Sequence, residues 1–140
     1  MTVAGDALLD TGPLVALLNA RDHDHSRCVA TFREFRGRLL TTEPILTEAM
    51  QLLAPIHGAG GACIDFFARK AAVLVPQSAA SLVRAKILLA KYDDVPMDFA
   101  DATLVVLAEE VKVSQVFTLD RRGFSVYRFG RNRSFTIFPV

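Results

Sequence analysis

Short apolar runs recur along the chain and alternate with longer segments of helical periodicity. Runs of this length with few polar residues are typical of strands that are buried on both faces of a sheet. Turn-forming residues or a carboxylate end most of the runs, which supports their interpretation as strands. The runs lie at residues 7–10, 39–41, 72–75 and 115–119, and the tail at residues 124–140 predicts one or two short edge strands.

Helices are predicted in the segments between these runs. Pro13 and Pro44 each suit the first turn of a helix, where a missing N–H costs nothing. An amphipathic helix is predicted within residues 21–37, with Asp24 as its candidate N-cap and Gly37 at its end. Three further helices are predicted. The first covers residues 62–70 and follows a turn at Gly58, Gly60 and Gly61. The second runs from a cap at Ser78 or Ser81 to residues 91–94, and the third covers residues 96–107.

The alternation of strands and helices predicts the fold class. Strands that alternate with helices form a mostly parallel sheet covered on both faces, so we expect a three-layer α/β/α fold with four to five central strands. The chain has 140 residues and 51% of them are hydrophobic. This is enough for one substantial core, so we expect residues 1–140 to form a single domain.

Composition and charge narrow the class of protein further. The formal net charge of +1 argues against a polycationic tail, although it allows a local basic surface. Cys28 and Cys63 stand in no metal-binding or redox spacing, so we expect free thiols of a reducing compartment. Residues 1–10 lack the pattern of a signal peptide, and no apolar run reaches the roughly 18 residues of a membrane span. We therefore expect a cytoplasmic protein without membrane contact.

Four acidic residues share an unusual setting at the ends of apolar segments. Asp10 and Asp120 each end a predicted strand, and Glu48 lies at the edge of the apolar stripe of a helix. Asp101 shares its helical face with apolar residues only. Because the carboxyl ends of parallel strands line one crevice, where ligands bind, we expect these side chains to meet there.

The helix at residues 96–107, "PMDFADATLVVL", carries two carboxylates in its first turn although it is otherwise built for burial. Asp98 is a good N-cap, and Asp101 at the third helical position would complete a capping box. Capping alone therefore explains this pair about as well as a binding role does. It does not explain why Asp10, Glu48 and Asp120 also lie at apolar junctions with no basic residue placed to pair with them.

A cluster of these carboxylates would need a cation. Two carboxylates about 5 Å apart repel by roughly 3 kcal/mol at an effective dielectric constant near 20. Oxygen ligands without His or Cys suit a hard cation, Mg²⁺ or Mn²⁺. A transition-metal site at "RDHDH" is a weaker alternative, since His23 and His25 do not share a helical face.

Four segments, "LLDTGPLVALLN", "LTEAMQLL", "PMDFADATLVVLAE" and "VFTLDRRGF", resemble in order and spacing the acidic motifs of PIN-domain ribonucleases. The resemblance covers residues 8–129 and is strongest to the VapC-type toxins of toxin–antitoxin pairs. It implies a PIN-like domain in which acidic residues bind the metal, with small hydroxyl residues beside the first and last acids. The implied metal ligands are Asp10, Glu48, Asp101 and Asp120 with Asp98 as an accessory acid, and the implied hydroxyl residues are Thr11 and Thr118.

The same resemblance implies the activity and the partners. We expect a Mg²⁺- or Mn²⁺-dependent endoribonuclease that hydrolyses phosphodiester bonds of single-stranded or looped RNA, leaving 5′-phosphate and 3′-hydroxyl ends. We also expect a homodimer and a small VapB-type antitoxin whose C-terminal segment blocks the acidic crevice. The alternatives are a non-toxic PIN-domain nuclease of RNA processing and a non-catalytic PIN module that binds protein. A receiver domain, a phosphotransfer fold that also has an acidic pocket, fits the sequence less well. Such domains carry a Lys after a late strand, whereas the late strand here ends in "TLD".

Basic residues gather after the last acid. Arg121, Arg122 and Arg128 are candidates for contact with the phosphate backbone of the substrate, together with two later arginines. The alternative is a solvated arginine edge that prevents strands of other molecules from pairing here. The aromatic residues of this tail, Tyr127, Phe129 and Phe135, fit core packing better than stacking on bases.

Overall fold

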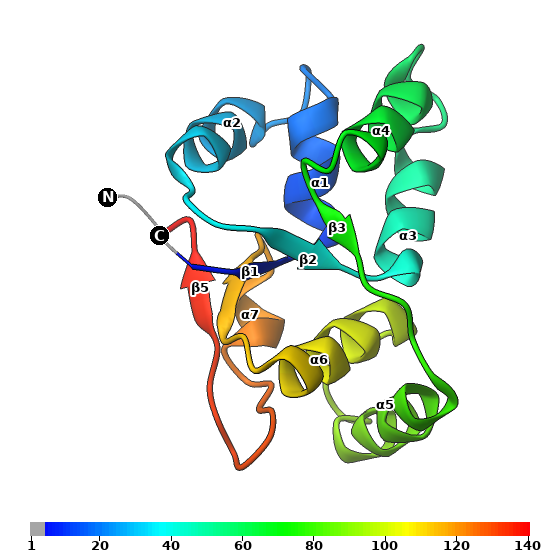
Figure 1. Cartoon of the computed structure of the whole chain (residues 1–140), viewed down its shortest axis with the longest axis vertical. Coiled ribbons are helices and arrows are strands. Elements are labelled where there is room, and N and C mark those ends of the chain that lie inside the picture. The colour runs from blue at the N-terminus through cyan, green and yellow to red at the C-terminus, as the bar shows by residue number, and fades with distance from the viewer. Residues whose placement is uncertain (1–4) are drawn as a thin grey trace.

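The computed structural model describes residues 5–140 as a parallel five-stranded sheet with helices on both faces (Figure 1). The predicted three-layer fold is therefore confirmed. Residues 1–4, on which part of the signal-peptide prediction rests, lie outside the described residues. Within residues 5–140, none of the helices combines the length and the hydrophobicity that crossing a bilayer requires.

The strands are short, and the sheet order is β3-β2-β1-β4-β5 with every neighbouring pair parallel. Side chains of β1, β2 and most of β4 are buried, because helices cover both faces. This explains why their sequences are almost entirely apolar. The strands are β1 (Ala7–Leu9), β2 (Leu39–Thr41), β3 (Val73–Leu74), β4 (Gln115–Phe117) and β5 (Thr136–Phe138), the last being the predicted edge strand.

The helices form the two outer layers of the fold. In Figure 1, α1 to α4 lie on one side of the sheet and α5 to α7 on the other. This division follows the chain, since the crossovers from β1 and β2 use the first four helices and the crossover from β3 uses α5 and α6. The helices are α1 (Thr11–Leu18), α2 (His25–Glu34), α3 (Glu43–Leu53), α4 (Ala59–Ala68), α5 (Ala79–Lys91), α6 (Phe99–Val111) and α7 (Arg121–Phe124).

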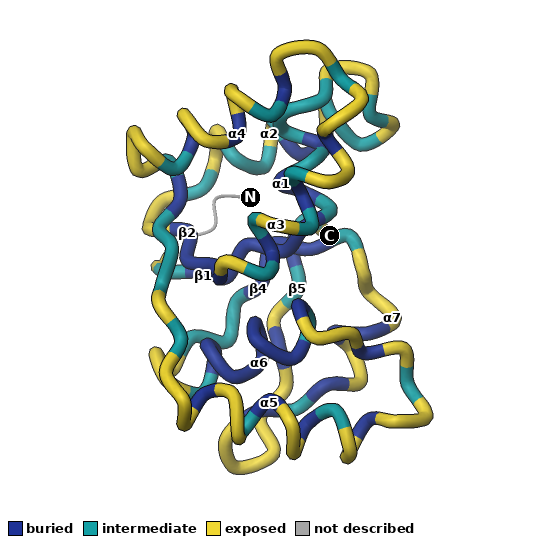
Figure 2. Tube along the Cα trace, turned by 90° about the vertical axis from the view of Figure 1, so that its right-hand side faces the viewer, coloured by how far each residue is buried: buried dark blue, intermediate teal, exposed yellow. Residues whose placement is uncertain are grey.

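Helix α6 is the most deeply buried helix (Figure 2). Every residue from position 102 to position 108 is buried, so the helix is apolar all round rather than on one stripe. Helix α5 packs along it, and Arg84 of α5 forms a two-point ion pair with Glu109 of α6 at 2.9 and 3.0 Å. Burial of α6 explains its composition, but its carboxylates need a separate reason.

The structure corrects several predicted boundaries. Helix α4 begins at Ala59 rather than after the glycines, so only Gly58, with φ of 76°, forms the turn. Helix α2 ends at Glu34, before Gly37, and its N-cap Asp24 makes no capping hydrogen bond through its side chain. The short helix α7 was not predicted, because four residues carry too little periodicity to be recognised. The two cysteines are free, as predicted, and both are buried.

The strand order fixes where a ligand site can form. Successive strands run from β1 outward to β3, and the chain then returns to place β4 on the opposite side of β1. In open parallel sheets, a crevice opens at this switch point, beyond the carboxyl ends of the strands. Asp10 directly follows β1 and Thr118 directly follows β4, so both lie at the switch point.

Candidate active site

Asp10 is held in place at the end of β1 by two short hydrogen bonds. Its Oδ1 accepts from the N–H of Thr11 at 2.9 Å, and its Oδ2 accepts from the hydroxyl of Thr118 at 2.6 Å. The same Thr118 oxygen accepts from the N–H of Asp120 at 2.9 Å. Thr118 therefore joins the first and the last predicted acids through one hydroxyl group, and it orients Asp10.

The first turn of α6 is closed by the predicted capping box. The N–H of Asp101 donates to Oδ1 of Asp98 at 2.8 Å, and the N–H of Asp98 donates to Oδ2 of Asp101 at 3.1 Å. The box explains how two carboxylates are accommodated three residues apart, since each satisfies an N–H that the helix leaves free. Each carboxylate uses one of its two oxygens for its capping bond.

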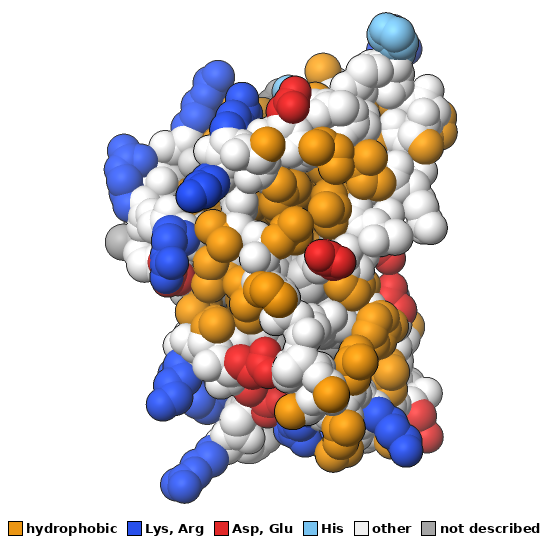
Figure 3. Space-filling view, turned by 45° about the vertical axis from the view of Figure 1, so that its right-hand side comes forward, with side chains coloured by type: hydrophobic (Ala, Val, Ile, Leu, Met, Phe, Trp, Pro, Cys, Tyr) orange, Lys and Arg blue, Asp and Glu red, His pale blue; other side chains and the backbone are white. Residues whose placement is uncertain are grey.

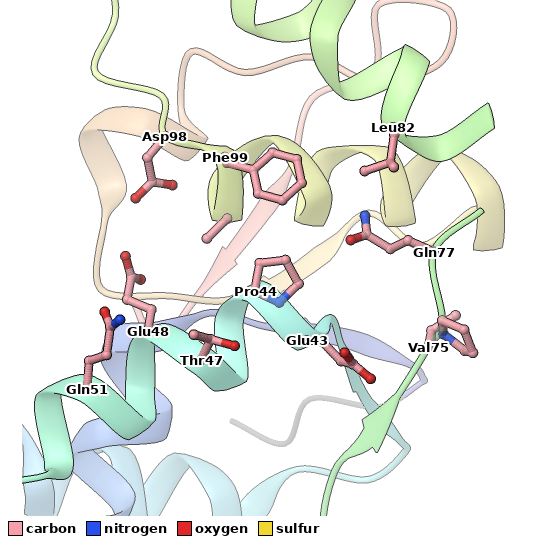
Figure 4. A pocket seen from close by; sticks show the side chains of 12 residues that line it. Glu43, Pro44, Thr47, Glu48, Gln51, Val75, Gln77, Leu82, Asp98 and Phe99 are labelled. Atoms are coloured by element: carbon pink, nitrogen blue, oxygen red, sulfur yellow. The ribbon is translucent and has the colours of Figure 1, made fainter. Parts of the chain in front are cut away.

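The structure brings four of the five predicted acids together. A pocket of about 440 Å³ is lined by Asp10, Glu48, Asp101 and Asp120, together with Thr11. Asp98 does not line this pocket; it lies on the neighbouring one, where Figure 4 shows its carboxylate facing that of Glu48. The geometry therefore favours Asp101 over Asp98 as a primary ligand. We call the pocket lined by Asp10, Glu48, Asp101 and Asp120 the acidic pocket.

Two carboxyl groups of the acidic pocket bind protons unusually tightly. Burial raises the pKa of Asp10 to about 6, against the lowering effect of its hydrogen bonds from Thr118 and Thr11. Burial also raises the pKa of Asp101 to about 8, and the nearby charges of Asp10 and Asp98 raise it further. Among residues 5–140, no Lys or Arg forms a salt bridge with these carboxylates. The pocket therefore has an excess of negative charge.

The residues of the acidic pocket fit a hard divalent cation in their chemistry. All the donor atoms are oxygens, and the hydroxyl of Thr11 is buried without a hydrogen-bond partner among the described residues. A cation with its water would satisfy both features. As oriented, no three Asp, Glu, His or Cys side chains in residues 5–140 stand close enough to hold an ion. Asp10, Asp101 and Asp120 each hold one carboxylate oxygen toward a backbone N–H.

The raised pKa values predict how the metal-free protein responds to pH. Both carboxyl groups bind protons more tightly in the folded chain than in the unfolded chain, so their contribution to stability is complete below about pH 4. It is lost as the pH rises through about 6 for Asp10 and about 8 for Asp101. In EDTA, the melting temperature should therefore fall as the pH rises through about 6 and then through about 8. Asp101→Asn should flatten the fall, whereas the exposed Asp65→Asn should leave it unchanged; a melting temperature that rises over this range would contradict the assignment.

The predicted arginines occupy different settings near the acidic pocket. Arg121 donates to the carbonyl of Pro139 at 3.0 Å, and one nitrogen of Arg128 donates to three backbone carbonyls of its own turn. Arg122 lines a pocket together with Asp120. Their contact with substrate stays a prediction.

Other predicted residues have structural partners. His25 Nδ1 lies 2.7 Å from the carbonyl of Ala16, which ties α2 to α1, and the exposed His23 lies beside Asp24. Tyr127, Phe129 and Phe135 are buried, as core packing requires, and Tyr127 packs edge-on against Tyr92 and Phe124.

Gly123 is a site residue that the sequence analysis missed. Its N–H donates to Oδ1 of Asp120 at 3.0 Å, which caps α7. A Cβ atom at position 123 would lie 2.5 Å from Oδ2 of Asp120 and 2.9 Å from the hydroxyl of Tyr127. Only glycine leaves room for the carboxylate in this position. The signal was an Asp followed three residues later by Gly, which is the spacing of an N-cap and its bonded N–H.

Figure 3 shows acidic side chains set among hydrophobic ones on one face, with Lys and Arg gathered along the left edge and the lower end of the view. The basic groups therefore flank this face on two sides of the view.

Comparisons with known proteins identify the family of the chain. The model of the PIN domain family matches residues 7–130. Ribonuclease VapC26 of Mycobacterium tuberculosis is 30% identical over 134 residues, which cover 94% of this chain and 99% of that protein. Among solved structures, VapC20 of Mycobacterium tuberculosis, a toxin that cleaves the sarcin–ricin loop, matches with a TM-score of 0.73 at 20% identity, over 79% of this chain and 86% of its own. VapBC2 of Rickettsia felis bound to promoter DNA matches with a TM-score of 0.65 at 12% identity, over 96% of this chain and 99% of that chain.

This chain belongs to the PIN domain family. The predicted resemblance to PIN-domain ribonucleases of the VapC type is thereby confirmed, and the similarity extends over nearly the whole chain.

Proposed function

We propose that this chain is a metal-dependent endoribonuclease and the toxin of a type II toxin–antitoxin pair. The observation that carries the proposal is the acidic pocket at the switch point of the sheet, in a chain 30% identical to a ribonuclease over nearly its full length. The toxin–antitoxin complex from Klebsiella pneumoniae, with a TM-score of 0.61 at 16% identity over 86% of this chain and 91% of that chain, shares the fold.

The residues of the pocket have separable roles in this proposal. Asp10, Glu48, Asp101 and Asp120 would supply the ligands of Mg²⁺ or Mn²⁺. When bound, such a cation lowers the pKa of water and neutralises charge on the phosphate. Thr118 orients Asp10, and one of the carboxylates accepts the proton of the attacking water.

Asp98 supports the pocket from the side. Its capping bond fixes the first turn of α6 and hence the position of Asp101, so we assign it an accessory role. Arg122, next to Asp120, is the best placed of the three arginines to contact a phosphate of the RNA.

An antitoxin fits the same pocket for an electrostatic reason. A crevice with four carboxylates attracts a cationic side chain as well as a metal ion, so an antitoxin Arg or Lys would compete with the cation. Leu52, which is 56% exposed, lines the acidic pocket and offers an apolar contact beside the charges. A homodimer is also expected, and the exposed Val83 and Ile87 of α5 form an apolar stripe that a second copy would cover.

Metal binding should stabilise the folded protein, because the cation binds the assembled carboxylates and removes their repulsion. We expect millimolar Mn²⁺ to raise the melting temperature at neutral pH relative to EDTA by several degrees, as about 1–2 kcal/mol of stabilisation would in a domain of this size. The increase should shrink in Asp10→Asn and Asp101→Asn and persist in Asp65→Asn, whose side chain is exposed on α4. An equal increase in all four proteins would place the metal elsewhere.

A further inference from the structure

A second hollow of about 760 Å³ adjoins the acidic pocket. It lies between the first half of α3, the connection from β3 to α5, and the first turn of α6, and Figure 4 shows its side chains. Glu48 lines both hollows, so they share a wall at this residue. We call the second hollow the side pocket.

The lining of the side pocket differs from that of the acidic pocket. Phe99 and Leu82 are 45% and 50% exposed, and with Pro44 they make its walls largely apolar. The side-chain amides of Gln51 and Gln77 have no hydrogen-bond partner among the described residues. Figure 4 shows Phe99 above Pro44, with Gln77 and Leu82 on the side opposite Asp98 and Glu48.

Charge excludes a phosphate group from the side pocket. No Lys or Arg lines it, whereas the carboxylates of Glu43, Glu48 and Asp98 do. A ligand here must therefore be uncharged or cationic, flat enough to lie on Phe99, and able to bond amide groups at its edge. A nucleobase meets all three conditions, since its faces stack on aromatic rings and its edges carry donors and acceptors.

We propose that the side pocket binds the base of an RNA nucleotide next to the cleaved phosphate, an inference that rests on the proposed ribonuclease function. Phe99 is the stacking platform and Gln77 bonds the edge of the base. Phe99 lies two residues before Asp101 on the same helical turn, so a phosphate at the acidic pocket brings a neighbouring base to this ring. Because Gln77 offers a carbonyl oxygen and the charged groups of the lining are all acceptors, the pocket favours bases with an exocyclic amino group over uracil.

The obvious competing occupant is a second copy of the chain, pressed against the apolar walls. The centre of a protein interface is depleted in charged residues, whereas three carboxylates and two free amides line this pocket. The wall that the side pocket shares with the acidic pocket at Glu48 also favours the substrate.

The test compares Phe99→Ala, Phe99→Leu and Gln77→Ala with wild type on short single-stranded RNAs that vary next to the cut. Phe99→Leu keeps an apolar side chain and removes the aromatic face. Both Phe99 variants should raise KM about tenfold, the effect of losing one stacked base. Gln77→Ala should relax the preference for amino-bearing bases over uracil. Ile64→Ala, which shortens a side chain 47% exposed on α4, is the matched control for KM.

Two further readouts separate the possible failures. The rise in melting temperature with Mn²⁺ should equal that of wild type in every variant, which shows that the acidic pocket is intact. Fluorescence anisotropy of a labelled single-stranded RNA in Ca²⁺ tests the side pocket even if wild type cleaves nothing, and Phe99→Ala should then bind about tenfold more weakly.

Unchanged KM, base preference and RNA binding in the Phe99 and Gln77 variants would overturn the side-pocket proposal while leaving the nuclease intact. A Phe99→Ala protein that loses its dimer in sedimentation, with base preference unchanged, would also overturn it and assign the face to a second copy. Absence of cleavage by wild type, with RNA binding that still depends on Phe99, would instead contradict the proposed function and retain the pocket as a base-binding site.

Discussion

Asp10→Asn should lower RNA cleavage by about a thousandfold, which corresponds to about 4 kcal/mol of lost transition-state stabilisation. The substitution keeps the size of the side chain and can keep the bond from the N–H of Thr11, but it removes a charge from the acidic pocket. Glu48→Gln, Asp101→Asn and Asp120→Asn should each have a similar effect, because all four carboxylates line the same pocket. The measurement is the rate of cleavage of a labelled single-stranded RNA in Mn²⁺.

Asp98→Asn should cost less, because its carboxylate lies outside the acidic pocket and asparagine also caps helices well. Asp65→Asn is the surface control, and circular dichroism with thermal melting checks that every variant is folded. If Asp98→Asn were inactive while Asp101→Asn cleaved normally, the roles of the two residues would be reversed.

Expression of this chain alone should arrest or strongly slow the growth of a bacterial host, because an unregulated ribonuclease destroys RNA that the cell needs. Asp10→Asn should remove the effect, since it removes the charge on which metal binding depends. Co-expression of the small gene next to this one should restore growth if that gene encodes the antitoxin. The measurement is the growth rate after induction, with protein levels of wild type and variant matched by immunoblot.

The outcome separates the toxin from its alternatives. Normal growth with the wild type, equal to that with Asp10→Asn at the same protein level, would argue for a non-toxic nuclease or for a binding module. Growth arrest that Asp10→Asn also causes would show that toxicity does not depend on the acidic pocket.

The fold was predictable because its strongest signals are local. Apolar runs such as residues 7–10 and 115–119 cannot be stable as short exposed strands, so their burial in a parallel sheet followed from composition alone. The capping box at Asp98 and Asp101 was also visible in the sequence, since it depends only on residues three apart. By contrast, α7 is too short to show a helical period, and Gly60 and Gly61 hide the early start of α4 because glycine disfavours helices.

The site was predictable in its members but not in its geometry. Asp10 and Asp120, each at the end of a predicted strand, indicated one shared crevice. The hydrogen bonds of the Thr118 hydroxyl to both residues could not be predicted, because they form only when β1 pairs with β4. The separation of Asp98 from the acidic pocket depends on how α6 lies across the sheet, which no spacing in the sequence specifies. The need for Gly123 likewise appears only when its distance from Asp120 is known.

The central claim is that the acidic pocket hydrolyses RNA with the help of a divalent cation, and the ends of the RNA products test it most directly. The purified chain should cut a single-stranded RNA in Mn²⁺ and not in EDTA, leaving a 5′-phosphate on one product and a 3′-hydroxyl on the other. These ends are identified by mass spectrometry of the fragments, with Asp101→Asn run in parallel. Products that carry a 2′,3′-cyclic phosphate, or cleavage that persists in EDTA and in Asp101→Asn, would contradict the claim.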